Sequence, residues 1–323
     1  METDDRPASV EVFAPARLHL GFLDLNGGLG RRFGGLGVAI EGLGTRLTVS
    51  LAATAAANGP SAARALDYLG RAATAFGVPN GARIAIGQTC PEHVGLGSGT
   101  QLGLAVAAAL AQLHGLPLGA RALALAIERR ARSGIGIGAF ELGGFVVDGG
   151  RKTSTEPATV ITRLEFPSDW RFLLVLDPTR QGFHGPAESA AFAALPKFND
   201  ALAGELCRRL MLQLLPGVIE RDFAAVSDAL GEIQRRLGEY FSPTQNGAYS
   251  SPAVAEAMEH LARAGLTGLG QSSWGPTGFA LVDSAERAEA LVADLARRGV
   301  QGGLEFRVAG ARNRGADIIS RPG

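Results

Sequence analysis

The stretch PEHVGLGSGTQ, residues 91–101, places three glycines within five residues directly before apolar side chains that recur at helical spacing from Leu102 to Leu113. Residues 83–86 (RIAI) precede it and predict a strand. Glycines let the backbone approach a ligand closely, and the first amides of a helix lack internal partners and carry partial positive charge. The stretch therefore predicts a phosphate or diphosphate site, although a glycine-rich turn is also an ordinary connection between a strand and a helix. It matches neither the Walker nor the dinucleotide-binding pattern.

Composition excludes several classes of protein. The chain has 323 residues, enough for about two domains, and 46% of them are hydrophobic. Mean hydropathy is +0.13, which is typical of a globular protein. With 31 basic and 31 acidic residues, bulk charge predicts neither a nucleic-acid partner nor a membrane surface. Two cysteines cannot build a disulfide framework, the start lacks signal-peptide order, and the apolar runs are too short to span a bilayer, so we expect a cytoplasmic protein.

The order of predicted elements indicates an α+β protein of two parts. In the first part, residues 10–13, 18–25 and 45–51 predict strands, with a turn at 14–17, and residues 61–76 and 119–131 predict helices. In the second part, a buried strand at 171–176 precedes helices at about 199–215, 221–238 and 252–264 and a closing strand–helix–strand. A polar stretch at 151–157 places the boundary near 165, which gives domains 1–165 and 166–323.

Four features, in this order, resemble the GHMP kinase superfamily. Residues 14–18 (APARL) stand where those kinases carry an N-terminal strand motif, and residues 95–99 (GLGSG) resemble their phosphate-binding loop. Ser133-Gly134 followed by Gly143-Gly144 resembles their third conserved stretch, and residues 268–278 resemble their C-terminal glycine loop. The resemblance covers nearly the whole chain and implies a two-domain α+β fold with the active-site cleft between the domains.

One departure is chemically decisive. The kinase stretch Ser-Gly-x-Asp ends in the catalytic base, whereas this chain has Gly136 there. Longer blocks resemble one branch instead, the β-ribofuranosylaminobenzene 5′-phosphate synthases of tetrahydromethanopterin biosynthesis. These blocks are residues 17–24 (RLHLGFLD), 95–101, 139–141 (AFE) and 270–277 (GQSSWGPT).

This resemblance implies a decarboxylating phosphoribosyltransferase, a pentosyltransferase. The branch joins 5-phosphoribosyl 1-diphosphate to 4-aminobenzoate, or in some members 4-hydroxybenzoate, and releases diphosphate and carbon dioxide. Because no ring proton has to be removed, the reaction needs no strong base, which fits Gly136. Two alternatives stay open: an ATP-dependent small-molecule kinase in which Glu141 replaces the missing base, and a non-catalytic sugar-phosphate sensor. We expect Mg²⁺ with the diphosphate, no organic cofactor, and a homodimer formed by apolar helices of the second half.

The resemblance and the residue chemistry together name the candidate site residues. For catalysis they are Arg17, His19, Asp24 and Glu141, and for magnesium Glu141 or Asp148. Arginines bind carboxylate or phosphate bidentately, but the alternative is that two of Arg17, Arg31 and Arg32 are solvated surface charges. A tryptophan beside a glycine loop can stack on the aromatic substrate or simply pack. The substrate-binding candidates are His93, Gly95, Leu96, Gly97, Ser98, Gly99, Thr100, Gln101, Arg31, Arg32, Arg180, Glu188, Gln271, Ser272, Ser273 and Trp274, with His184 beside Glu188 on the same loop.

Overall fold

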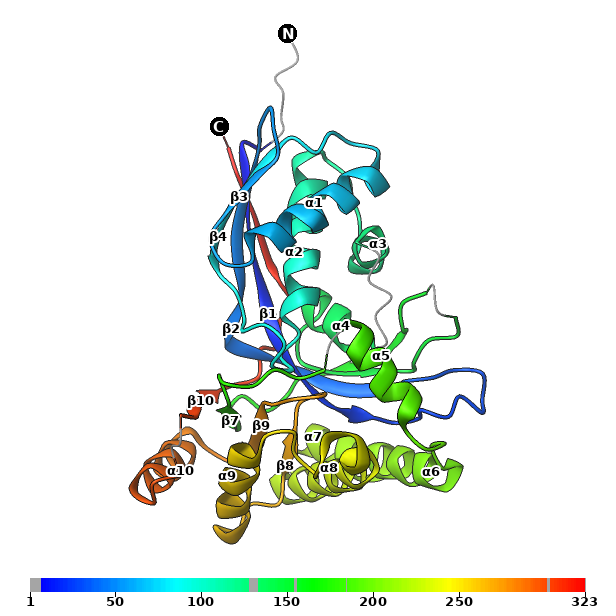
Figure 1. Ribbon diagram of the computed structural model, residues 1–323, viewed down its shortest axis with the longest axis vertical. Coiled ribbons are helices and arrows are strands. Elements are labelled where there is room, and N and C mark those ends of the chain that lie inside the picture. The colour runs from blue at the N-terminus through cyan, green and yellow to red at the C-terminus, as the bar shows by residue number, and fades with distance from the viewer. Residues whose placement is uncertain (1–6, 128–132, 154–155, 184, 301–302, 323) are drawn as a thin grey trace.

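The computed structural model describes residues 7–127, 133–153, 156–183, 185–300 and 303–322 (Figure 1). A seven-stranded sheet covered on one face by helices forms the upper part of the view, and a four-stranded sheet with its helices forms the lower part. His184 and part of the predicted helix 119–131 lie outside the described residues.

The larger sheet has the strand order β11-β1-β2-β4-β3, with β5 pairing to β2 and β6 to β5. Helices α1 to α4 lie on one face of it (Figure 1). The elements are β1 (Ser9–Phe22), β2 (Gly35–Leu51), β3 (Ala56–Asn58), α1 (Ala62–Phe76), β4 (Ala82–Gln88), α2 (Ser98–Leu113), α3 (Ala120–Ala126), α4 (Ile135–Glu141), β5 (Phe145–Asp148), β6 (Val160–Leu164) and the C-terminal β11 (Asp317–Arg321).

The smaller sheet is antiparallel, in the order β10-β7-β9-β8. Its two faces belong to different cores because side chains alternate along each strand: Leu173 and Val175 pack with α9, whereas Phe172 and Leu174 join the core beneath the larger sheet. The elements are β7 (Arg171–Leu176), α5 (Gly185–Ala194), α6 (Asp200–Arg209), the short π-helix η1 (Leu210–Leu214), α7 (Leu215–Glu220), α8 (Phe223–Gln245), α9 (Pro252–Arg263), β8 (Leu269–Gln271), β9 (Gly278–Val282), α10 (Ala285–Arg297) and β10 (Glu305–Ala309).

Strand β1 joins the two parts and corrects two predictions. The turn predicted at 14–17 is absent from it: the strand is continuous, and a shift in register lies between Pro15 and Arg17, since a proline cannot donate a ladder hydrogen bond. The division at 165 is also incomplete, because β11 returns from the C-terminus to pair with β1 in the larger sheet. Within the described ranges, none of the helices is both long and apolar enough to cross a membrane.

Candidate active site

The glycine-rich loop between β4 and α2 leaves backbone amides available to a ligand. His93, Gly95 and Gly97 have φ of 59°, 88° and 81°, so the chain turns back on itself at alternate residues. Gly97 is the N-cap of α2 and supplies no side-chain oxygen to the first turn. The amides of Ser98 and Gly99 have no acceptor inside the helix, and the helix dipole favours an anion beside them. This loop therefore has the geometry of a phosphate site.

Two elements far away in sequence hold the loop in place. From β1, the Arg17 amide donates to the Leu96 carbonyl (3.1 Å) and the Arg17 guanidinium to the Gly95 carbonyl (2.5 Å). From the glycine turn after β8, Thr277 donates to the Val94 carbonyl through both its hydroxyl (2.7 Å) and its amide (3.3 Å). The two loops touch so closely that a β-carbon at Gly95 would lie 2.2 Å from the Ser272 carbonyl oxygen. Only glycine fits at position 95.

Ser272 is a connector between these elements. Its hydroxyl accepts from the His19 amide (2.9 Å) and donates to the Gly95 carbonyl (2.7 Å), and the residue is fully buried. Gln271 is likewise engaged, since its side-chain oxygen accepts from the amide and hydroxyl of Ser250. We therefore assign Ser272 to positioning the loops, in place of the predicted contact with substrate. Gln271 also holds its loop, but it lines a second cavity described below. Ser273 does line the cavity described next.

A cavity of about 740 Å³ opens between the two parts of the molecule, next to the loop. Its walls include Arg17, His19 and Trp274, Glu188 of α5, and Gly95, Gly97 and residues 98–100 of the loop. Leu96 and Gln101, predicted to bind substrate, are buried and do not line it, because Leu96 packs into the hydrophobic core. His93 also lines it, and its carbonyl accepts from the Gly182 amide (2.7 Å), which ties the β7–α5 connection to the loop. The structure thus brings together predicted residues from four separate segments.

Helix α1 contributes a wall that the sequence did not predict. Arg64, Tyr68 and Arg71 line the cavity, and their spacing of four and three residues puts them on one face of the helix. Arg64 lies 3.3 Å from Glu92, and Arg71 lies 2.9 Å from Asp67. The sequence could have indicated this wall through the arginines on the polar side of an amphipathic helix. Such arginines usually face solvent, so the pattern alone does not predict a binding site.

His19 is buried at the floor of the cavity with 3% of its surface exposed. Burial, with a smaller contribution from the positive charge of Arg17, lowers the pKa of His19 to about 3. The imidazole is therefore neutral at ordinary pH. Neither ring nitrogen has a hydrogen-bond partner among the described residues, which leaves a buried donor and a buried acceptor beside the cavity.

Trp274 belongs to a group of aromatic rings. Its ring centroid lies 5.4 Å from Phe183, 5.1 Å from Phe192 and 4.7 Å from Phe241, all edge to face. The indole Nε1 is buried and makes no hydrogen bond within the part of the chain that the structure describes. One edge of the indole is thus packed, while the residue still lines the cavity.

Gly136, in the position of the kinase base, is tightly enclosed. A β-carbon there would lie 2.9 Å from the Thr100 Cγ2 atom. The buried side-chain amide of Gln101 also donates to the Gly136 carbonyl (2.8 Å) and fixes the start of α4 against α2. A carboxylate at position 136 cannot be added without moving Thr100.

Several predicted residues do not line this cavity. Asp24 accepts from the amides of Asn26 and Gly27 in the β1–β2 turn, because an Asp side chain is well placed to bond the backbone two residues on. Glu141 lies exposed at the end of α4, five residues after Gly136 and hence about 140° around the helix. Arg180 extends toward Asp177 (3.9 Å) and the Ser250 carbonyl instead.

Arg31 and Arg32 are corrected in the same way. The Arg31 guanidinium donates to the carbonyls of Gly149 and Gly150, each at 2.8 Å, and Arg32 donates to the Leu25 carbonyl. Both arginines hold turns at the end of the larger sheet, where backbone carbonyls compete with any ligand for their donors.

Comparisons with known proteins agree with this geometry. Residues 61–144 match the GHMP kinases N terminal domain and residues 214–301 match GHMP kinases C terminal. The chain is 34% identical to the beta-ribofuranosylphenol 5′-phosphate synthase of Archaeoglobus fulgidus, over 94% of this chain and 97% of that protein. The chain belongs to this synthase family. It is also 29% identical to the synthase of the same name from Methanothermobacter thermautotrophicus, over 95% of this chain and 98% of that protein.

Solved kinase structures share the fold of this chain. A homoserine kinase from Cytophaga hutchinsonii superposes with a TM-score of 0.70 at 18% identity, covering 99% of this chain and 100% of that one. A phosphomevalonate kinase from Streptococcus pneumoniae gives 0.69 at 13% identity, covering 95% and 100%. The fold is therefore the two-domain GHMP kinase fold.

The carboxylates of this synthase-family chain fit a magnesium ion only in part. Asp148 is fully buried, and its oxygens accept from the Ser133 hydroxyl and the amides of Gly134 and Gly150. Burial raises the pKa of Asp148 to about 6 although these hydrogen bonds oppose the shift. The described residues contain no group of three or more His, Cys, Asp or Glu side chains that could hold a metal. Any magnesium here needs phosphate oxygens as its main ligands.

Proposed function

We propose that this chain joins 5-phosphoribosyl 1-diphosphate to 4-hydroxybenzoate and releases diphosphate and carbon dioxide. One observation carries the proposal: the cleft keeps the anion site at the start of α2 while Thr100 packs against Gly136 where a kinase places its base. The relatives' name, which contains a ribofuranosylphenol, favours 4-hydroxybenzoate over 4-aminobenzoate as the acceptor.

The donor's diphosphate would bind at the amides of Ser98 and Gly99. Arg17 is the cation beside the loop, and Arg64 and Arg71 line the facing wall on α1. Electrostatic stabilisation of the leaving diphosphate is the main demand of this reaction, because negative charge builds up there as the bond to the ribose breaks. Mg²⁺ would arrive with the diphosphate and neutralise part of that charge.

The chemistry balances without an acid or base from the protein. The electron pair of the ring carbon that bears the carboxylate forms the new bond to ribose C1, and the C1–oxygen pair leaves with diphosphate. The carbon–carboxylate bond then breaks, its electron pair restores the aromatic ring, and carbon dioxide departs. Neutral His19 can orient a substrate by hydrogen bonding, but a pKa of about 3 makes it a poor base.

The proposal also covers the compartment, the pathway and the oligomeric state. We place the activity in the cytoplasm, in tetrahydromethanopterin biosynthesis, and in a homodimer. The exposed apolar side chains of Met211, Leu212 and Ile219 on η1 and α7 favour such pairing.

The test is incubation of the purified protein with 5-phosphoribosyl 1-diphosphate, Mg²⁺ and carboxyl-labelled 4-hydroxybenzoate, with 4-aminobenzoate in a parallel reaction. We expect labelled carbon dioxide that depends on both substrates, with the faster reaction identifying the acid. Absence of release from either acid, together with ATP-dependent phosphorylation of a small alcohol, would instead support a kinase.

A further inference from the structure

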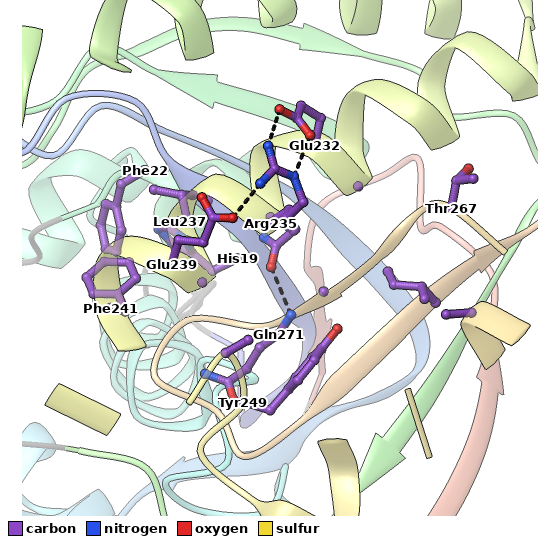
Figure 2. Close-up of a pocket in the computed structure, with 18 of the residues that line it drawn as sticks. His19, Phe22, Glu232, Arg235, Leu237, Glu239, Phe241, Tyr249, Thr267 and Gln271 are labelled. Carbon is purple, nitrogen blue, oxygen red and sulfur yellow. Dashed lines mark hydrogen bonds and ion pairs between the residues drawn. The ribbon is translucent and has the colours of Figure 1, made fainter. Parts of the chain in front are cut away.

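A second cavity, of about 600 Å³, meets the first one at His19, Phe22 and Ser273. It lies between α8 and the edge strand β8, on the side of the C-terminal part (Figure 2). The glycine-rich loop lines only the first cavity. The shared residues therefore form a junction with the phosphate site on one side and this second cavity on the other.

The walls of the second cavity suit a flat aromatic ring. Figure 2 shows the rings of Phe22 and Phe241 on one side and that of Tyr249 on another, with Leu237 nearby. Burial raises the pKa of Tyr249 to about 12, so its hydroxyl stays protonated and can donate a hydrogen bond. An apolar cavity with a few polar groups is typical of a small-molecule site.

At the end of the second cavity away from His19, the positive charge of Arg235 is not available to bind the carboxylate of the aromatic acid. Arg235 already donates to Glu232 (2.7 Å) and Glu239, as the dashed lines in Figure 2 show. At the inner end, the ring nitrogens of His19 are unpartnered within the described part of the chain. An aromatic acid in this cavity would therefore direct its carboxylate-bearing carbon toward the junction.

Stereochemistry supplies the direction of attack. The diphosphate of 5-phosphoribosyl 1-diphosphate lies on the α face of the ribose, whereas the relatives' product name specifies a β-riboside. The acceptor must then approach from the face opposite the leaving group. With diphosphate at Ser98 and Gly99, a ribose seated over His19 would border the second cavity, which shares His19 with the first cavity but is not lined by the glycine-rich loop.

We propose that the cavity between α8 and β8 is the binding site of the aromatic acid, and that His19, Phe22 and Ser273 form the junction where its ring meets ribose C1. This inference rests on the proposed function and adds the place and direction from which the acceptor enters.

The three tyrosines of the chain offer a test that needs no turnover. Tyr68 lines the first cavity, Tyr249 lines the second, and Tyr240 lines neither and donates to the Pro196 carbonyl (2.7 Å). In protein labelled with 3-fluorotyrosine and assigned through Tyr→Phe variants, magnesium diphosphate should shift the Tyr68 fluorine resonance. Adding 4-hydroxybenzoate should then shift Tyr249 in a saturable way and leave Tyr240 in place.

A cavity-filling variant tests the same site by kinetics. Gly238 of α8 lines the second cavity, and a β-carbon there meets only ordinary contacts, the nearest at 3.4 Å from Ala248. Gly238→Leu should raise KM for the acid at least about tenfold and leave KM for the phosphoribosyl donor within about twofold. Gly204→Leu is the matched control, because Gly204 is an exposed helical glycine with nothing within 4 Å of its β-carbon position.

The outcomes separate the two proposals. If labelled carbon dioxide is released by the wild type but the Tyr249 resonance stays fixed at acid concentrations that saturate turnover, the acceptor site is refuted while the function stands. An unchanged KM for the acid in a folded Gly238→Leu variant refutes it as well. If the wild type releases no carbon dioxide from either acid, the proposed function itself fails.

Discussion

The contact between Gly136 and Thr100 predicts an unusual response to a helical Gly→Ala substitution. In an open helix this change stabilises by about 1 kcal/mol, because alanine loses less backbone entropy on folding. At Gly136 the new β-carbon would lie 2.9 Å from Thr100 Cγ2, and overpacking of this kind costs about 1–3 kcal/mol. Gly136→Ala should therefore be neutral or destabilise by up to about 2 kcal/mol.

A double-mutant cycle isolates the contact. Thr100→Ser removes the Cγ2 methyl and keeps the hydroxyl, so Gly136→Ala should recover its helical gain in that background, with a coupling of about 1–3 kcal/mol. Gly204→Ala in α6 is the control and should stabilise by about 1 kcal/mol, since its β-carbon would meet open space. The assay is equilibrium unfolding in urea, followed by fluorescence of Trp170 and Trp274.

Two results would contradict this reasoning. The first is that Gly136→Ala stabilises the chain as much as Gly204→Ala does. The second is that Thr100→Ser leaves the effect of Gly136→Ala unchanged. Either result would mean that there is space for a side chain at position 136, where the kinases carry the carboxylate. Packing against Thr100 would then not explain the glycine at this position.

Three further predictions concern the site. Arg64→Met should raise KM for the phosphoribosyl donor roughly tenfold or more, because it removes a charged hydrogen bond to the donor. Arg31→Met removes only contacts to backbone carbonyls and should leave this KM unchanged. Equal effects of the two variants would support the sequence-based prediction that Arg31 binds substrate. Ser272→Ala should lower the free energy of unfolding by about 1–3 kcal/mol, because it leaves the His19 amide unpaired. The control is Ser168→Ala, which should change this free energy little because Ser168 is exposed. Similar urea midpoints for the two variants would contradict the role of Ser272 as a connector between the loops. The pKa of His19 is about 3 in the folded protein and near 6.5 in the unfolded chain. Burial of the neutral ring therefore contributes stability that is present above pH 6.5 and is lost as the pH falls through 3. In NMR, the His19 ring resonances should show no titration between pH 5 and 8, and a midpoint near 6.5 would disprove the burial of the ring.

Much of the fold was predictable because its signals are local. The strand and helix around residues 91–101 follow from periodicity, and the glycines between them follow from the backbone conformations that the loop requires. The turn predicted at 14–17 was wrong, because pairing with β2 on one side extends β1 through Pro15. Pairing partners lie far away along the chain, so a local pattern cannot supply them.

The candidate site divides in the same way. The anion loop and the missing carboxylate at Gly136 could be predicted, since each depends on neighbouring residues or on one position of a motif. The roles of Arg31 and Ser272 could not, because their partners are 118 and 177 residues away in the chain. A polar side chain can bind substrate only if the fold leaves its donors unused, and here the fold has used them.

The sequence by itself determined that a glycine-rich turn opens helix α2 and that glycine stands at position 136. The tertiary structure alone decided that α1 lines the cavity beside the glycine-rich loop, that Ser272 connects the loops, and that a second cavity shares His19 with the first. The physical reason is range: backbone conformation and helix termini depend on adjacent residues, whereas cavities and side-chain partners arise only when distant segments pack together.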